Sequence, residues 1–286
     1  MAKINPGMPC IKNVLTDATK ILANCSDLPQ LDAEVLLCLT LKKERTYLRT
    51  WPDKELEAEQ EAAFWEYLNK RQHGTPVAYL TGTREFWSRD FLVTPDVLIP
   101  RADTELLVEL CLTIIPANAP SSIIDLGTGS GIIAITLAAE CPHTEVTATD
   151  YSLAALHIAQ LNAKKHNINN IQFVQSDWFN EITPTHYHLI VSNPPYIAPD
   201  DQHLIQGDLR FEPLSALRSD EQGLRDIKIL AETAPRYLLP QGYLLVEHGY
   251  DQQQAVQALF KENGFSQIQT FTDLSGQPRV TRGQWL

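Results

Sequence analysis

Residues 122–135, Ser-Ile-Ile-Asp-Leu-Gly-Thr-Gly-Ser-Gly-Ile-Ile-Ala-Ile, decide the fold of this chain. A β-branched run leads into a glycine-rich turn, and the apolar residues after the turn suit a helix. Glycines let the backbone approach a ligand closely, and the amides at a helix start present partial positive charge to a carboxylate or phosphate. The stretch therefore predicts a strand, a nucleotide-cofactor loop and a helix.

The spacing of the glycines in this loop narrows the cofactor class. Gly127, Gly129 and Gly131 stand at every second position, whereas the third glycine of the dinucleotide pattern falls one residue later. A dinucleotide is therefore disfavoured. Nineteen residues beyond Gly131 a second strand-like run ends in Asp150, where a carboxylate can accept both ribose hydroxyls, although Asp150 alone would serve NAD equally well. The predicted cofactor loop consists of Gly127, Thr128, Gly129, Ser130 and Gly131.

Two further strand-like runs end in residues that suit a nucleoside and a planar amine. Residues 171–175 are followed by Ser176, Asp177 and Trp178, and there a carboxylate can accept from an exocyclic amine while an indole covers a purine. An aspartate at a strand end is also a common helix N-cap. Residues 189–191 lead, through Ser192, to the fourth strand end.

The tetrapeptide Asn193-Pro194-Pro195-Tyr196 forms that fourth strand end. Its prolines forbid further strand pairing and stiffen the backbone, so that the Asn193 side-chain oxygen and the Pro194 carbonyl can both accept hydrogen bonds from one NH2 group. A planar group held there can stack on Tyr196. Asn-Pro also opens ordinary turns. Four consecutive strand ends with ligand-binding residues nevertheless indicate a site, because an open α/β sheet gathers its ligands at that edge.

In these motifs the chain resembles class I S-adenosylmethionine-dependent methyltransferases that methylate planar nitrogens, and within them the PrmC or HemK family. That family comprises the protein-(glutamine-N5) methyltransferases of peptide chain release factors. The resemblance extends to residues 97–105, 207–214 and 242–249, although the family usually has proline where this chain has Ala102. It implies S-adenosylmethionine as methyl donor, no metal, and a cytoplasmic release factor as protein substrate. The acceptor would be the glutamine of the Gly-Gly-Gln (GGQ) motif that acts in translation termination.

Alternating strands and helices between Ser122 and Gly249 predict an α/β fold with a Rossmann-like, mostly parallel sheet. The closing runs 267–273 and 279–285 predict an antiparallel edge. Helical periodicity in the first seventy or so residues predicts a small N-terminal helical domain, with helices over 11–25, 28–41 and 55–70. We predict three parts, namely a helical substrate-recognition domain (1–75), a linker (76–98) with a β-hairpin over Val77–Val93, and a methyltransferase domain (99–286).

Composition favours a soluble cytoplasmic enzyme and excludes several other classes. The 286 residues carry a formal net charge of −12, which repels a phosphate backbone, so no direct nucleic-acid substrate is expected. The five cysteines form no C-x-x-C pair and the histidines no metal-ligand spacing, so we expect reduced thiols and no metal site. Neither a charged-then-apolar leader nor an apolar run near about 18 residues is present, so neither secretion nor a membrane span is expected.

The predicted chemistry requires that a poor nucleophile be positioned well. A carboxamide nitrogen shares its lone pair with the carbonyl, and hydrogen bonds from its NH2 group to Asn193 and the Pro194 carbonyl would orient it and strengthen as the nitrogen becomes positive. Arg101 would meet the methionine carboxylate or the substrate backbone, or form an ordinary salt bridge with Asp103 or Glu105. His248 ends a strand at the functional edge without an assigned role.

Two other function classes remain open from the sequence. Asn-Pro-Pro-Tyr also suits the exocyclic amine of adenine or cytosine, so a DNA or RNA amino-methyltransferase is the main alternative, although such an enzyme needs a basic face or a target-recognition domain. A cofactor-binding sensor without enzymatic activity is a third possibility. The intact turn from Asn193 to Tyr196 argues against a sensor, because a sensor has no use for acceptors aimed at an amine.

Overall fold

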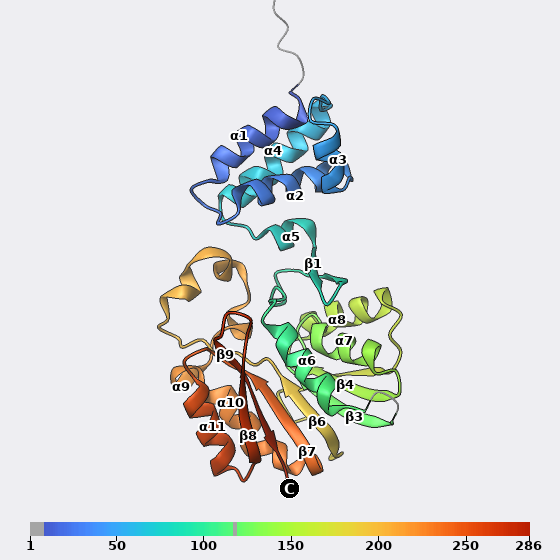
Figure 1. The fold of residues 1–286 in the computed structure, drawn as a ribbon, viewed down its shortest axis with the longest axis vertical. Helices are drawn as coiled ribbons and strands as arrows, with labels where there is room; N and C mark the ends of the chain where they lie inside the picture. The colour runs from blue at the N-terminus through green and yellow to red at the C-terminus, as the bar shows by residue number, and fades with distance from the viewer. Residues whose placement is uncertain (1–8, 117–118) are drawn as a thin grey trace, which may run out of the picture. The chain divides into compact units, whose positions relative to one another are not determined.

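The computed structural model describes residues 9–116 and 119–286, which form two compact units (Figure 1). The first, here called the helical unit, ends at Gly82 and also includes Ile205–Phe211. The second, here called the sheet unit, consists of Thr83–Leu204 and Glu212–Leu286. The three parts predicted from the sequence are divisions by function, with limits after residues 75 and 98, and they stay predictions.

The helical unit is built from short amphipathic helices. In α1 the buried side chains Ile11, Val14 and Ala18 recur at helical spacing, and they pack with the leucines of α2 and α4 and with Phe64 in one core. The predicted helices are confirmed with small shifts, whereas the six residues of α3 are too short to show a period. The helices are α1 (Ile11–Leu22), α2 (Pro29–Leu41), α3 (Arg45–Thr50), α4 (Ala58–Gln72) and α5 (Val77–Thr81).

Buried Arg71 attaches the segment Ile205–Phe211 to this unit. Its guanidinium donates to Asp32 Oδ2 and to Asp208 Oδ1, each at 2.8 Å. The pairing of one buried cation with two carboxylates offsets the cost of its burial. A stretch far along the chain is thereby held among the N-terminal helices.

The predicted hairpin over Val77–Val93 is partly wrong. Residues Val77–Thr81 form the helix α5, which begins after Pro76 and ends at Gly82 with a left-handed φ of 70°. The hairpin is shorter, with strands β1 (Thr83–Phe86) and β2 (Arg89–Leu92). Proline favours the start of a helix and glycine its end, so Pro76 and Gly82 bound a short helix before the hairpin.

The sheet unit contains one seven-stranded sheet in the order β5-β4-β3-β6-β7-β9-β8. All neighbouring strands pair in parallel except that β9 runs antiparallel to both β7 and β8, which confirms the predicted parallel sheet with an antiparallel edge. The strands are β3 (Ser121–Leu126), β4 (Thr144–Asp150), β5 (Ile171–Gln175), β6 (Tyr187–Ser192), β7 (Leu238–Glu247), β8 (Ser266–Thr272) and β9 (Pro278–Gln284).

Helices cover both faces of this sheet (Figure 1). Successive strand residues such as Ile123 and Ile124 enter different cores, one lined by α6, α7 and α8 and the other by α10 and α11. Burial on both faces explains why the strands are apolar runs rather than alternating ones. The helices are α6 (Thr104–Ile114), α7 (Ile132–Glu140), α8 (Leu153–Lys165), α9 (Asp220–Gly223), α10 (Arg225–Thr233) and α11 (Gln253–Glu262), with short 3₁₀ turns at Gln202–Ile205, Gly207–Phe211, Leu214–Ala216 and Ala234–Arg236.

The order of strands reverses at β3, which pairs with β4 on one side and β6 on the other. Leu126 at the end of β3 lies opposite both Thr149 and Ser192. Parallel pairing therefore brings three strand ends to the same edge, and such a reversal is where α/β sheets bind ligands.

Asp125 is a buried carboxyl directly beneath this edge. Its side chain is fully excluded from solvent, and its Oδ2 accepts a hydrogen bond from the Thr128 hydroxyl at 2.7 Å. Burial raises the pKa of Asp125 from 3.8 to about 7, against the opposing effect of the Thr128 hydroxyl. A charge on Asp125 is therefore costly to the folded protein.

We predict that Asp125→Asn removes part of the pH dependence of stability. Because the folded-state pKa exceeds the unfolded one, the contribution of Asp125 is most favourable below pH 4 and is lost as pH rises through about 7. Between pH 5 and pH 8 the free energy of unfolding of the wild type should fall relative to the variant by about 2 to 3 kcal/mol. Urea denaturation at both pH values measures this difference, and equal changes in the two proteins would contradict the prediction.

Candidate active site

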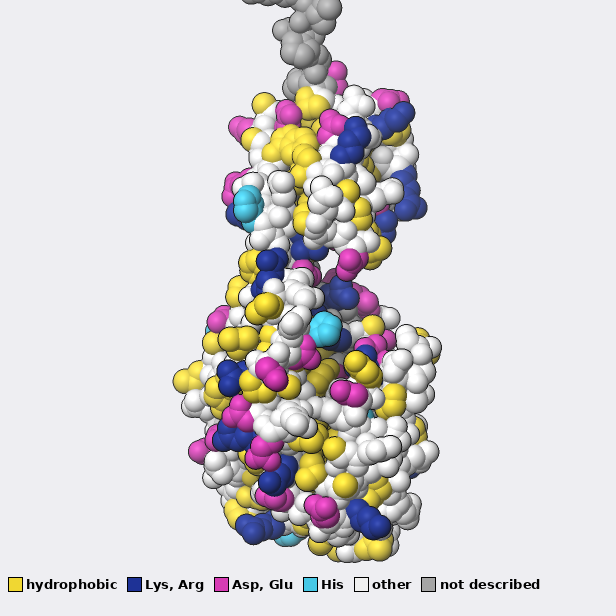
Figure 2. Space-filling model, turned by 90° about the vertical axis from the view of Figure 1, so that its left-hand side faces the viewer, with side chains coloured by type: hydrophobic (Ala, Val, Ile, Leu, Met, Phe, Trp, Pro, Cys, Tyr) yellow, Lys and Arg dark blue, Asp and Glu magenta, His cyan; other side chains and the backbone are white. Residues whose placement is uncertain are grey.

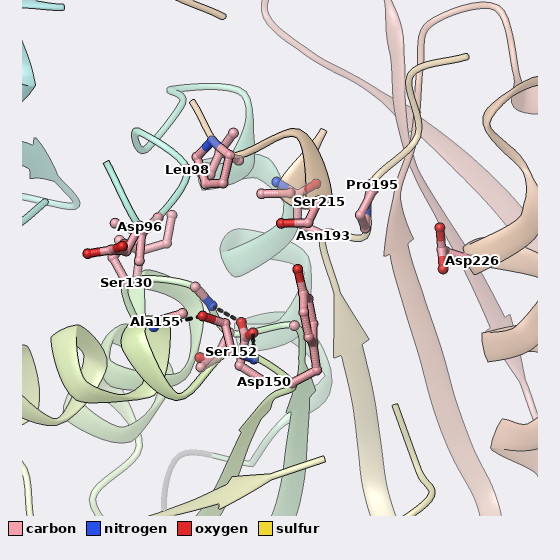
Figure 3. A pocket seen from close by; sticks show the side chains of 18 of the residues that line it. Asp96, Leu98, Ser130, Asp150, Ser152, Ala155, Asn193, Pro195, Ser215 and Asp226 are labelled. Atoms are coloured by element: carbon pink, nitrogen blue, oxygen red, sulfur yellow. Dashed lines mark hydrogen bonds between the residues drawn. The ribbon is translucent and has the colours of Figure 1, made fainter. Parts of the chain in front are cut away.

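A cavity of about 590 Å³ opens at the carboxyl ends of β3, β4, β5 and β6 (Figure 3). Its volume lies in the usual range for small-molecule sites. Asp150 and Asn193, from different strands, both line it. The structure brings most of the sequence-predicted site residues to its wall, namely Gly127, Thr128, Gly129, Ser130, Asp150, Asp177, Trp178, Asn193 and Pro195. Three others, Gly131, Pro194 and Tyr196, are not among the residues that line it.

The glycine loop has left-handed backbone at each of its three glycines. A Cβ on Gly129 would project into open space, whereas a Cβ on Gly131 would lie 2.7 Å from Ile135 Cδ1. Gly131 is the residue before α7, and its φ of 85° is one that other residues rarely adopt. Gly129 therefore keeps room for a ligand, while Gly131 allows α7 to pack.

Asp150 ends β4 and connects the glycine loop to α8. Its Oδ2 accepts from the Gly129 amide and its Oδ1 from the Ser152 amide, both at 2.9 Å (Figure 3). Burial raises the pKa of Asp150, and these two amides act against that rise. Each carboxylate oxygen keeps a further lone pair, so the group can still accept two hydroxyls.

The third strand end is shaped by a left-handed residue. Trp178 has a φ of 53°, and its ring lies 3.5 Å from where a Cβ of Gly127 would stand. The Ser176 hydroxyl donates to the Trp178 carbonyl at 2.8 Å and accepts from the Glu181 amide. Glu181 also accepts from the Asp177 amide at 2.9 Å. These hydrogen bonds hold the indole over the glycine loop. The indole face was predicted from the sequence, but the hydrogen bonds that position it were not.

Asn193 follows β6 and is held by a residue of α6. Its Nδ2 donates to the Thr104 hydroxyl at 3.2 Å. The preceding residue, Ser192, is buried and donates from its hydroxyl to the Leu126 carbonyl at 2.7 Å, which ties β6 to β3. With its NH2 group engaged by Thr104, the Asn193 side chain has its oxygen left as the acceptor.

Tyr196 lies under the turn rather than along the cavity. Its hydroxyl donates to Glu247 Oε1 at 3.2 Å, and its carbonyl accepts from Gln252 Nε2 at 3.0 Å. Burial, with the nearby Glu247, raises the pKa of the Tyr196 phenol. Its predicted stacking on the substrate stays a prediction. In the structure, Tyr196 anchors the turn to Glu247 and Gln252.

Gly223 closes over the same turn. With a φ of 83°, it approaches the Tyr196 carbonyl so closely that a Cβ would lie 2.0 Å from that oxygen. The Gln252 side chain bridges the two segments, since its Nε2 also contacts the Gln222 carbonyl at 3.2 Å. Only a glycine leaves the Tyr196 carbonyl in this position.

Arg101 forms a salt bridge with Glu212, a residue far from it in sequence. It pairs with Glu212, not with Asp103 or Glu105, and Glu212 is buried and also accepts from the Ile99 amide at 2.9 Å. Glu105 instead accepts from the Trp87 amide at 3.0 Å. The predicted local salt bridge is therefore wrong, because folding brings residue 212 closer to Arg101 than its neighbours in sequence.

His248, at the functional edge, is buried within the sheet unit. Its ring nitrogens hydrogen bond to the Gly249 carbonyl and the Thr281 hydroxyl, both at 2.8 Å. Burial lowers the pKa of His248. These contacts give it a structural role between β7 and β9.

The described part of the chain contains no group of three or more His, Cys, Asp or Glu side chains that would hold a metal ion. In residues 9–116 and 119–286, no helix has the length and apolar character needed to cross a membrane. All five cysteines are free thiols.

Sequence reasoning missed four residues that hold the candidate active site: Thr104, Glu247, Gln252 and Gly223. None stands in a motif with Asn193. Thr104 begins α6, Gly223 ends α9, and Glu247 and Gln252 lie at the end of β7 and at the start of α11. The acidic end of the run 242–249 was the one available signal, since a buried strand that ends in glutamate needs a partner for the charge.

Comparisons with known proteins place these features in a family. The PrmC N-terminal domain matches residues 13–82 and the methyltransferase small domain matches residues 103–209. Release factor glutamine methyltransferase of Vibrio cholerae is 48% identical over 277 residues, 96% of each chain, and that of Shewanella oneidensis is 44% identical over 277 residues, 97% of this chain and 96% of the relative.

Among solved structures, a methyltransferase from Pyrococcus furiosus is similar in fold, with a TM-score of 0.54 and 14% identity. The match covers 77% of this chain and 98% of that one. At this identity the likeness shows the fold alone, that of the class I methyltransferases, in agreement with the sequence-based expectation.

We predict that Gly223→Ala disturbs the turn at Asn193–Tyr196. The new methyl group would lie 2.0 Å from the Tyr196 carbonyl, so the turn must shift, and melting temperature and activity should both fall. Gly276→Ala is a matched control, because Gly276 has a similar φ of 79° but open space around its Cβ position. The melting temperatures of both variants, measured by circular dichroism, separate the effect of the clash from that of backbone strain. Equal decreases in melting temperature in Gly223→Ala and Gly276→Ala would contradict the prediction.

Proposed function

Because the chain belongs to the release factor glutamine methyltransferases, we propose that the cavity at the strand ends is its catalytic site and that the GGQ glutamine of a release factor enters it. The protein is an S-adenosylmethionine-dependent protein-glutamine N-methyltransferase. The orientation of Asn193 supports the assignment of the site most directly. Its NH2 group is bound to Thr104, so its oxygen remains to accept from an amine in the cavity.

The residues along the cavity fit S-adenosylmethionine. Gly129 leaves space that a side chain would fill, and the Asp150 carboxylate retains capacity for two ribose hydroxyls. Trp178 offers an indole face and Asp177 an acceptor for the adenine. We assign Gly127 to Gly131 to the methionine part and these three side chains to the nucleoside. When bound, S-adenosylmethionine supplies a methyl group made electrophilic by a sulfonium centre.

The turn from Asn193 to Tyr196 would act on the acceptor amide. The Asn193 oxygen would accept one N–H group of the glutamine, and the carbonyl of Pro194, which stands between the two lining residues Asn193 and Pro195, would accept the other. The nitrogen lone pair would then point away from both acceptors. As the nitrogen gains positive charge, both hydrogen bonds strengthen, which favours the transition state over the ground state. The nitrogen then loses one proton to water.

Methyl transfer to the amide nitrogen does not require a strongly basic side chain. Aligned reactants can lower a barrier by about 7 to 11 kcal/mol relative to free reactants. Asn193 is half-buried, which adds to the effect because hydrogen bonds are electrostatically stronger away from water. Glu247 does not line the cavity, so we assign it no direct proton transfer.

We infer that the helical unit recognises the release factor away from its glutamine. We keep the predicted domains 1–75, 76–98 and 99–286 as part of this proposal. The cavity is formed by sheet-unit residues only, and the end of the predicted linker, Pro95 to Leu98, contributes to it. The enzyme would work in the cytoplasm, where translation factors act. On the face drawn in Figure 2, basic and acidic side chains of the described residues are interspersed, which agrees with a protein substrate better than with a nucleic acid.

The proposed substrate can be tested with isotopically labelled S-adenosylmethionine. Purified release factor, DNA and RNA are incubated in parallel with the enzyme, and mass spectrometry locates the methyl group. We expect label on the GGQ glutamine. Label only in adenine or cytosine would instead support the nucleic-acid alternative, and label on a different glutamine would reject the assigned acceptor.

We predict that Asn193→Ala lowers kcat by about 100-fold or more, because it removes an acceptor that acts on the developing charge. The affinity for S-adenosylmethionine, measured by calorimetry, should change little. Asn263→Ala serves as a control, since Asn263 caps α11 away from the cavity lining. Turnover of the Asn193 variant near that of the wild type would refute the mechanism.

We predict that Asp150→Ala weakens S-adenosylmethionine binding by about tenfold or more, because hydrogen bonds to a charged acceptor are each worth about 1.5 to 3 kcal/mol. The carboxylate also orders Gly129 and Ser152. Asp150→Asn keeps one acceptor oxygen and should bind with intermediate affinity. Unchanged dissociation constants in titration calorimetry would remove Asp150 from the site.

A further inference from the structure

Buried Glu212 joins two segments of the sheet unit, residues 95–101 and 213–218, most of which line the cavity. Its side chain is fully excluded from solvent. Its Oε2 accepts from the Ile99 amide at 2.9 Å, and its Oε1 accepts from the Arg101 guanidinium. Proline at position 100, between these two partners, has a fixed φ. The carboxylate therefore holds a short and stiff stretch of chain against the segment that follows Glu212.

Both segments are also connected to the turn that begins at Asn193. The Thr104 amide donates to the Arg101 carbonyl at 3.2 Å, and the Thr104 hydroxyl accepts from Asn193. Directly after the turn, the Ile197 amide donates to the Leu217 carbonyl at 2.9 Å. The ion pair of the first segment with Glu212 is therefore part of a ring of contacts that includes the turn.

The cavity has two sides with different roles under the proposed function. Figure 3 shows Asn193, Leu98 and Ser215 on one side of it and Asp150 on the other. Asp150 is assigned to the nucleoside of S-adenosylmethionine, and Asn193 to the acceptor amide. Leu98 and Ser215 come from the two segments that Glu212 joins, so the ion pair belongs to the acceptor side of the cavity.

The Arg101 guanidinium has hydrogen-bond donors that the protein does not use. A guanidinium carries five N–H groups in one plane, and in the part of the chain that the structure describes its only side-chain hydrogen bond is the one to Glu212. The Arg101 side chain is 35% exposed and lines the cavity. Because Glu212 already balances its charge, the remaining N–H groups need an acceptor but no further anion. A neutral carbonyl oxygen meets that need.

The proposed substrate offers such carbonyl oxygens next to the acceptor. The two residues before the glutamine of the GGQ motif are glycines, which have no side chain to recognise. An enzyme can hold this stretch only by close fit and through main-chain N–H and carbonyl groups. Unused guanidinium donors on the acceptor side of the cavity suit one of these carbonyls.

We propose that Arg101 binds a main-chain carbonyl of the glycines before the acceptor glutamine, and that Glu212 is a positioning residue that directs the Arg101 guanidinium toward it. This role rests on the proposed function of the cavity and extends it to the main chain of the substrate. Of the two ligands expected for Arg101 from the sequence, the substrate backbone is thereby favoured over the methionine carboxylate.

Arg101→Lys tests this contact while a cation still pairs with buried Glu212. Lysine lacks the planar fork, so it cannot hold Glu212 and a carbonyl in the same geometry. We expect kcat/KM for the release factor to fall by about tenfold or more and the dissociation constant of S-adenosylmethionine to stay within about twofold. Weaker binding of S-adenosylmethionine would assign Arg101 to the methionine carboxylate instead, and an unchanged kcat/KM would likewise overturn the proposal.

Arg89→Lys is the matched control for the loss of an arginine fork. Arg89 also pairs with a glutamate, Glu140, at 2.9 Å, and its side chain is 26% exposed. It does not line the cavity. This variant should keep the wild-type kcat/KM. A loss equal to that of Arg101→Lys would show that any arginine–glutamate pair of the sheet unit has the same effect, and would overturn the proposal.

Glu212→Gln tests the positioning role. The amide keeps one acceptor oxygen for the two donors that the carboxylate satisfies, so the hold on Arg101 weakens and kcat/KM should fall. If Glu212 acts through Arg101, the losses are not additive, and Arg101→Lys/Glu212→Gln should lie within about twofold of the less active single variant. Losses that multiply would show that Glu212 acts independently of Arg101.

A modified substrate tests the carbonyl contact directly. Release factor is prepared by chemical ligation with sulfur in place of the carbonyl oxygen of either glycine in the GGQ motif. Sulfur is a weaker acceptor, so at one of these positions kcat/KM of the wild type should fall by about threefold or more. Arg101→Lys should not distinguish that substrate from the unmodified one. The same decrease in both enzymes, or no decrease in the wild type, would refute the contact.

These outcomes differ from those expected if the proposed function is wrong. Wild-type enzyme that leaves the GGQ glutamine of unmodified release factor without a methyl group would refute the proposed function, and the role of Arg101 would fall with it. Full wild-type activity, together with a wild-type kcat/KM in Arg101→Lys, would refute the role of Arg101 alone.

Discussion

The parallel pairing of β3 with β4 and β6 is the constraint on which the candidate active site depends. Leu126 lies opposite Thr149 on one side and Ser192 on the other, so the next residues along the chain lie at the same height on this edge. Those residues are Gly127, Asp150 and Asn193, which belong to motifs far apart in sequence. A one-residue slip would turn every side chain of the slipped strand to the opposite face. Burial on both faces of the sheet makes the register costly to change.

Around this edge, buried polar groups set the direction of the side chains that face the cavity. Asp150 is bound by two backbone amides, and the turn after β6 is held by Thr104, Glu247 and Gln252. Such groups are expensive to bury unless their hydrogen bonds are satisfied. Under the proposed function, these groups would orient the side chains that hold the acceptor amide. Methyl transfer to a neutral amide nitrogen depends on this orientation rather than on a strong base.

Much of the fold and part of the candidate site could be predicted from local patterns. The boundaries of β5 (Ile171–Gln175) were predicted without error, and nine of the twelve residues predicted for the site line one cavity. The two failures have different causes. Residues 77–81 were predicted as part of a hairpin but are helical, and the local signals for that helix are Pro76 and Gly82. Arg101 pairs with residue 212 rather than with a neighbour, and local patterns do not contain such a pairing, since it arises only when separate elements pack.

Local patterns were enough to predict the order of strands and helices, the glycine loop and the residue types at each strand end, because these follow from backbone preferences and side-chain types within a few residues. Which groups hold those side chains depends on how distant elements pack together. Thr104 and Glu247 lie 143 positions apart in the chain, yet Thr104 holds Asn193 and Glu247 holds Tyr196, so both support the same turn. These contacts form between separate elements, so they are a property of packing rather than of any local pattern.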